Sequence, residues 1–255
     1  MKTILAIVSA IALSITSVHA AYIGGVEFGA GQVTITGNVF FNTTPIDPQV
    51  AIPDQNLISQ GIGQVTEIRG AEGVLWSAAT ASKEFNFLFD NIKLDSIVGP
   101  FLTDTFLYGN ILGDVSFYSN TIGTFAPTGV FATDTASIIL GDLLLGGVGH
   151  AVNDYTVTGS TDADSNAGTG QLDILTGLAY AVIVQDTLAR TDGSLADMTF
   201  NFSADDTNTN GYVWGGSADF STTTVAEPSI AMLMGAGMLG MGFVSTRRRK
   251  DEKSI

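Results

Sequence analysis

Alternation of apolar and polar residues with a period of two recurs along residues 21–226 and constrains the fold more than any other feature. Successive side chains of a strand point to opposite faces, so each alternating run presents one apolar face to a core. Turn-forming segments such as residues 45–48 and 126–129 separate the runs. The alternating apolar positions are Val33, Ile35, Val39 and Phe41; Phe85, Phe87 and Phe89; Tyr155 and Val157; and Met198, Phe200 and Phe202.

The composition of this region also favours strands. It is rich in Thr, Val, Ile, Phe and Gly, and its charge is mostly Asp, which forms turns rather than helices. Short strands between frequent turns predict an all-β domain over residues 21–224, either a sandwich or a jelly roll. For residues 171–190 we expect a strand, because Gly177 and the β-branched residues 182–184 disfavour a helix. Residues 138–145 fit a buried strand or a short helix equally well.

Charge and cysteine content exclude several classes of function. The chain carries 25 acidic and 10 basic residues, for a net charge of −15, and it contains no cysteine. Within residues 21–226 the only basic residues are Arg69, Lys83, Lys93 and Arg190. Such an acidic surface repels nucleic acid, and it suits divalent cations or a hydrated extracellular setting. Disulfides and thiolate metal sites are excluded by the lack of cysteine.

The first 20 residues have the pattern of a secretory signal peptide. Lys2 gives a short charged start, residues 4–15 form an apolar stretch, and Val18-His19-Ala20 is a small-residue cleavage pattern. We therefore expect residues 1–20 to be removed and the mature protein to begin at Ala21. The protein is then exported.

The last 31 residues combine a short motif, an apolar run and a basic tail. Residues 229–246 contain no charge, and as a helix they would extend about 27 Å, close to the thickness of a bilayer core. Basic residues beside a span are retained on the cytoplasmic side, which places residues 247–255 inside the cell and the β-rich domain outside. The predicted membrane stop consists of Arg247, Arg248, Arg249 and Lys250.

The order Val225-Ala226-Glu227-Pro228, apolar span and Arg-rich finish resembles the PEP-CTERM sorting signal of Gram-negative bacteria. Ala226 stands where that family has its first proline. Short segments such as residues 61–68, 84–89 and 113–118 also resemble recurrent PEP-CTERM ectodomains, which are all-β surface proteins. The resemblance implies that residues 225–255 are a sorting signal processed by an exosortase, an integral-membrane transpeptidase that cuts near the motif.

From these features we expect an exported protein that is held briefly in the inner membrane and then released to the cell surface or the extracellular matrix. Its expected role is structural or interactive, with the exosortase-type enzyme as a partner, extracellular polysaccharide as a further possible partner, and no nucleic acid. Proline at position 228 pushes the preceding residue towards an extended conformation. The motif should therefore stand as an accessible segment outside the bilayer.

A second hypothesis is a calcium-assisted carbohydrate-binding module. Asp206, Asn208 and Asn210 place oxygen ligands at positions 1, 3 and 5 of a calcium-type loop, glycine follows at position 6, and Tyr212 could offer its carbonyl at position 7. Position 12 is Ser217, which lacks the bidentate carboxylate. The alternative is a hairpin with a type I′ turn at Asn-Gly.

Exposed aromatic residues would give the same module a surface for sugars. Tyr212 and Trp214 alternate beside the loop and are candidates for stacking on a sugar ring. A third hypothesis is a polysaccharide hydrolase, since paired carboxylates are abundant in an acidic chain. We predict no enzymatic activity and assign no catalytic residue, because His150 is the only histidine after the predicted signal peptide and no Gly-x-Ser-x-Gly motif is present. Calcium is the one cofactor that the sequence suggests.

Overall fold

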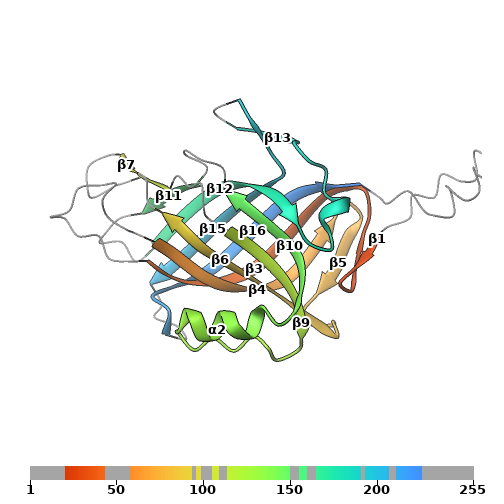
Figure 1. The fold of residues 1–255 in the computed structure, drawn as a ribbon, viewed down its shortest axis with the longest axis horizontal. Coiled ribbons are helices and arrows are strands. Elements are labelled where there is room, and N and C mark those ends of the chain that lie inside the picture. The colour runs from red at the N-terminus through yellow and green to blue at the C-terminus, as the bar shows by residue number, and fades with distance from the viewer. Residues whose placement is uncertain are drawn as a thin grey trace, which may run out of the picture.

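The computed structural model describes residues 21–43, 58–93, 96–98, 105–108, 114–149, 155–159, 165–190, 193–206 and 211–225. These residues form mainly β-strands (Figure 1). The elements are β1 (Ala21–Ile23), β2 (Val26–Phe28), β3 (Gly31–Thr43), β4 (Ile58–Gly70), β5 (Gly73–Ser77), β6 (Lys83–Lys93), β7 (Ser96–Val98), β8 (Thr105–Tyr108), β9 (Asp114–Thr121), α2 (Phe131–Ile138), β10 (Asp142–Gly149), β11 (Tyr155–Gly159), β12 (Ser165–Thr176), η1 (Tyr180–Val182), β13 (Leu188–Ala189), β14 (Leu195–Ala196), β15 (Met198–Asp206) and β16 (Trp214–Thr224).

Eight of the strands close into an antiparallel barrel (Figure 1). Around the barrel the order is β3, β4, β6, β9, β10, β12, β15 and β16, and β16 pairs with β3 to complete the ring. Each barrel strand pairs with the barrel strand that follows it in sequence. The all-β prediction is confirmed. The sandwich or jelly roll is wrong, because pairing between β10 and β12 joins what would have been two facing sheets into one closed sheet.

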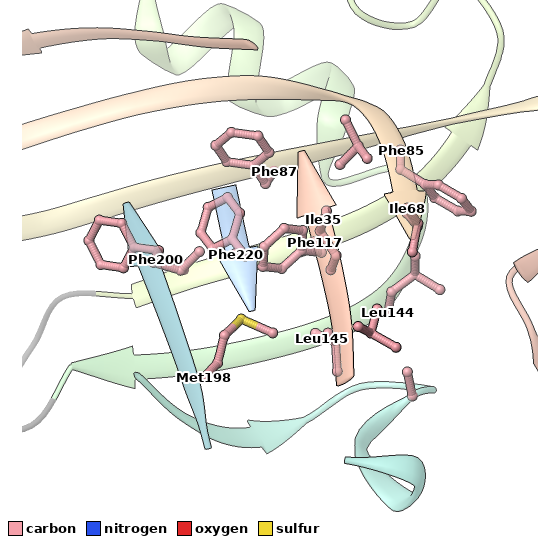
Figure 2. Close-up of a cluster of buried hydrophobic side chains, with 14 of the residues drawn as sticks. Ile35, Ile68, Phe85, Phe87, Phe117, Leu144, Leu145, Met198, Phe200 and Phe220 are labelled. Carbon is pink, nitrogen blue, oxygen red and sulfur yellow. The ribbon is translucent and has the colours of Figure 1, made fainter. Parts of the chain in front are cut away.

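Aromatic rings fill the centre of the barrel (Figure 2). The ring of Phe220 lies 4.8 Å from that of Phe117, 5.1 Å from Phe87 and 5.8 Å from Phe200, between ring centroids. These four rings come from β16, β9, β6 and β15, so the aromatic contacts cross the barrel interior. Tilted and edge-on ring pairs of this kind add stability beyond the apolar area that they bury.

The alternation read from the sequence identifies this core. Val33, Ile35, Val39 and Phe41 of β3 are all buried, at 2–5% exposure. In β4 the buried positions shift from Val65 to Ile68 because a β-bulge changes the pairing with β3 between Thr36 and Gly37. A bulge inserts one extra residue, so the inward face changes from odd to even positions.

Glycines in β4 allow the aromatic rings to pack against bare backbone. A Cβ atom added at Gly63 would lie 2.0 Å from Cζ of Phe87, and one added at Gly61 would lie 2.6 Å from Cζ of Phe89. Real Cβ atoms do not approach so closely. These two positions therefore require glycine for space, because the inward-facing rings of β6 occupy the volume that a side chain would need.

Helix α2 covers part of the outer wall of the barrel, and in Figure 1 it lies beneath β4 and β9. A second apolar cluster packs between the helix and the outward-facing side chains of the strands. The cluster contains Ile62, Leu88, Ile138 and Tyr212, with Phe40, Tyr118, Phe125 and Phe131 packed against it. The outer wall is thus apolar where the helix sits.

Buried polar side chains attach the segment around α2 to the barrel. Oε2 of Glu84 accepts a hydrogen bond from the backbone N–H of Gly123 at 2.9 Å. Nδ2 of Asn120 donates to the carbonyl of Ile138, the last residue of α2, at 3.2 Å. Because buried polar groups are costly unless they are paired, these bonds fix both ends of the segment.

Residues 171–190 and residues 138–145 each contain part of a strand and part of a helix. The strand predicted over residues 171–190 continues only to Thr176, because Gly177 adopts φ +113° and turns the chain into the short 3₁₀ helix η1. The expectation of a strand at residues 182–184 is therefore wrong, apart from an isolated bridge between Ile183 and Thr224. Residues 138–145 contain the end of α2 and the start of β10.

One end of the barrel, which we call the exit end, is where β16 finishes at Thr224 beside the start of β3 at Gly31. Oγ1 of Thr224 donates to the carbonyls of Gly29 and Gly31, at 2.5 and 3.1 Å. Ala21 is 4% exposed and belongs to the barrel core. Strand β1 lies at this end of the barrel in Figure 1. The hairpin β1–β2 therefore packs where β16 ends.

Candidate functional site

The predicted calcium loop lies between β15 and β16, at the end of the barrel opposite the exit end. Asp206 pairs with Trp214 across the two strands, so residues 207–213 connect them. The hairpin that Asn-Gly suggested is confirmed, because β15 and β16 pair antiparallel up to Asp206 and Trp214, and the type I′ turn stays a prediction. Gly211 has φ +80°, as a turn glycine would. Asn208 and Asn210 lie outside the described residues.

Tyr212 is buried beneath α2 rather than exposed for stacking on a sugar. Its relative exposure is 0%, and it belongs to the cluster on the outer wall of the barrel. Trp214 instead packs against the cluster inside the barrel. The two rings, expected to alternate beside the loop, therefore lie in different clusters, because β16 begins only at Trp214 and the preceding residues do not continue its alternation.

A buried carboxylate explains why Tyr212 turns under the helix. The hydroxyl of Tyr212 donates to Oδ2 of Asp134 at 2.8 Å. Asp134 also accepts from the backbone N–H of Thr128 at 3.0 Å and from the Thr128 hydroxyl at 2.7 Å. Burial, followed by the hydrogen bond and the charge of Asp134, raises the pKa of the Tyr212 hydroxyl above its usual range. The hydroxyl therefore remains a donor at neutral pH.

The same region contains a close approach of two backbone segments. Gly129 and Gly211 both have positive φ, at +82° and +80°. A Cβ atom added at Gly129 would lie 2.5 Å from the Cα of Gly211. The segment before α2 is thus held against the segment before β16 by glycine contact and by the hydrogen bonds of Asp134. Asp134 and Thr128 were not among the predicted site residues, because no local sequence pattern marks their contact with Tyr212.

The calcium hypothesis receives no complete ligand set from the described part of the chain. Among these residues, no three His, Cys, Asp or Glu side chains gather closely enough to hold a metal ion. The ligands proposed at Asp206, Asn208, Asn210 and the Tyr212 carbonyl remain a prediction.

Trp214 takes part in an aromatic cluster at the barrel end that carries this loop. Its ring stacks on that of Phe41, with centroids 6.2 Å apart and an interplanar angle of 19°. Phe41 also contacts Phe202 and Phe89, at 5.6 and 6.0 Å. Trp214 is partly buried. One face of the Trp214 ring therefore packs against Phe41. Sugar stacking on Trp214 stays a prediction.

The predicted sorting motif begins where the barrel ends. Val225 follows β16 directly, and its N–H donates to the carbonyl of Val182 at 2.8 Å while its side chain is 45% exposed. Ala226, Glu227 and Pro228 lie outside the described residues, as do residues 229–255 and the predicted signal peptide. His150 lies outside them as well. In the parts of the chain that are described, no helix has the length and apolar character needed to cross a membrane.

Comparison with protein-family models gave no match, and comparison with curated proteins gave none. Among solved structures, the chain is weakly similar to the Diels–Alderase AbmU from Streptomyces koyangensis. The match covers 76% of this chain and 69% of that one, with 8% identity and a TM-score of 0.23. A second structure is described as a nonspecific heme-binding cyclase that catalyses a [4 + 2] cycloaddition in neoabyssomicin biosynthesis. It has the same identity and TM-score over 84% of this chain and 75% of that one. At this TM-score the likeness carries no argument about fold or function.

Proposed function

We propose that this chain is an exported cell-surface or extracellular-matrix protein whose acidic β-barrel has a structural or interaction role. In this proposal residues 1–20 are removed on export and residues 229–246 hold the chain in the inner membrane. An exosortase-type enzyme then processes the motif at residues 225–228. The acidic composition supports an extracellular setting.

The observation that carries the proposal is the position of the motif relative to the fold. Strand β16 pairs with β3 through Thr224 and with β15 through Thr222, and the motif starts directly after the strand, at Val225. A processing enzyme requires an extended and accessible segment. A motif at the border of the barrel can be cut without unfolding the strands, which supports a sorting role for residues 225–228.

The packed barrel interior supports a structural or interaction role. The rings of Phe87, Phe117, Phe200 and Phe220 contact one another across the centre, and Gly63 leaves no space beside Phe87. A barrel filled in this way is a rigid scaffold. Its outer surface and loops then carry the contacts with other molecules.

Release from the membrane tests the proposal. In a host that contains an exosortase-type enzyme, the parent chain should appear at the cell surface or in the medium, and the Pro228→Ala chain should stay in the membrane fraction. Glu72→Ala, which changes an exposed carboxylate far along the chain, is the matched control and should be released normally. Equal release of the Pro228→Ala chain would contradict the sorting role.

A further inference from the structure

Exposed apolar side chains gather at the exit end of the barrel, where the chain continues towards the predicted membrane span. Leu175, Leu178 and Tyr180 are 59%, 57% and 41% exposed, and Val225 is 45% exposed. The N–H of Leu178 donates to the carbonyl of Leu143 near the start of β10. Val225 bonds to the carbonyl of the last η1 residue, two positions after Tyr180. We call Leu175, Leu178, Tyr180 and Val225 the exit surface.

The length of the following chain limits how far this surface can stand from a bilayer. Only residues 226–228 separate Val225 from Ser229, the first residue of the uncharged run. Four residue steps span at most about 14 Å. The headgroup layer of a bilayer is about 5–8 Å thick on each side. When the run is inserted, the exit end must therefore lie at or just above the lipid headgroups.

We propose that the exit surface docks on the membrane, with its side chains at the boundary between headgroups and acyl chains. The inference rests on the proposed function, because the apolar run must be inserted. Leucine side chains favour the acyl region, and a tyrosine ring is suited to the interface because its body is apolar and its hydroxyl is polar. Docking holds the barrel at a defined height, with the motif at residues 225–228 lying along the membrane surface.

Weak contacts are sufficient for this docking. The inserted run makes the encounter of the barrel with the bilayer intramolecular, and the effective concentration of lipid surface is then high. The lipid preference follows from charge, since the chain carries a net charge of −15 and five of its ten basic residues lie in the tail beyond the predicted span. An anionic bilayer repels such a domain. Docking should therefore be stronger on phosphatidylcholine than on membranes rich in anionic lipid.

Single-cysteine labelling provides the test, because the chain has no cysteine of its own. The full chain carrying Leu178→Cys is labelled with a fluorophore and reconstituted into phosphatidylcholine vesicles that contain brominated lipid. Val213→Cys is the matched control, because Val213 is 44% exposed at the opposite end of the barrel. The expected result is quenching at position 178 at least about threefold stronger than at position 213, since bromine quenches only over short range and the two ends lie a barrel length apart.

A second variant tests whether the apolar side chains drive the contact. Replacing Leu175 and Tyr180 with Ser in the labelled chain should shift the docking equilibrium about tenfold towards the undocked state, since both side chains lose apolar area that docking would bury. Because both are exposed, the fold should tolerate these changes, and an unchanged melting temperature verifies this.

The outcomes separate failure of docking from failure of the proposed function. A chain that does not float with the vesicles has no inserted tail, which overturns the proposed function and the docking together. A chain that floats but shows equal quenching at positions 178 and 213 overturns docking alone. Disulfide crosslinking between two unlabelled Leu178→Cys chains without lipid quenching would assign the surface to a second copy of the protein and overturn the membrane contact.

Discussion

Removal of the hydrogen bond between Tyr212 and Asp134 should destabilise the protein by an amount that the structure allows us to bound. Tyr212→Phe deletes one hydroxyl that donates to a buried carboxylate at 2.8 Å. Hydrogen bonds to charged groups contribute about 1.5–3 kcal/mol. Asp134→Ala should cost more, about 3–5 kcal/mol, because it also removes both bonds from Thr128 and leaves the Tyr212 hydroxyl buried without an acceptor.

A double-mutant cycle isolates the contribution of this one contact. In the Tyr212→Phe background, Asp134→Ala should cost about 1.5–3 kcal/mol less than in the parent, because the Tyr212 donor is already absent. Urea unfolding of the full chain in mild detergent measures each free energy. Tyr180→Phe is the control, since Tyr180 is 41% exposed, and it should change stability by less than about 0.5 kcal/mol.

Additive effects would refute this reasoning. Independent sites add to within about 0.3–0.5 kcal/mol. If the coupling between positions 212 and 134 falls in that range, the buried contact does not hold the segment before β16 against α2. The hydrogen bond to Asp134 would then not explain why Tyr212 is buried beneath α2.

Three further outcomes follow from the packing and the charges. Gly63→Ala should destabilise the barrel by about 3 kcal/mol, because its Cβ would lie 2.0 Å from the ring of Phe87, whereas Gly29→Ala, with nothing within 4 Å, should change urea stability by less than about 0.5 kcal/mol. Burial, and then the charge of Asp90, raises the pKa of the Asp114 carboxyl above 3.8. The folded state therefore binds the Asp114 proton more tightly than the unfolded state does, and the contribution of Asp114 to the free energy of unfolding falls as pH rises from about 4. Asp114→Asn should therefore raise the melting temperature at pH 7, with the gain vanishing below pH 4. The raised pKa of Tyr212 predicts that Tyr212→Phe leaves the phenolate absorbance of the folded chain at about pH 11 unchanged, and a lower absorbance would contradict this.

The sequence predicted the inward face of the strands because that face is a local property. Val33, Ile35, Val39 and Phe41 alternate in the sequence, and all four are buried. Closure of the barrel could not be predicted in the same way. It depends on the pairing of β10 with β12, and Gly146 and Gly147 show no apolar alternation that would specify this partner.

The site near β16 illustrates the same limit. The Asp-Asn-Gly pattern correctly indicated a turn, and Gly211 has the positive φ expected of it. The burial of Tyr212 depends on Asp134, which is 78 residues away in sequence. An aspartate in the first turn of a short helix is common for local reasons. A contact so distant in sequence leaves no mark in the spacing of the residues, and the tyrosine therefore resembled an exposed stacking residue.

The intact mass of the exported protein tests the central claim most directly. The account predicts a mature chain that begins at Ala21 and ends within or next to residues 225–228, without the apolar run and the basic tail. Both ends are read in one measurement on protein recovered from the cell surface or the medium. A full-length mass, or a chain found only in the cytosol, would contradict export, anchoring and processing together.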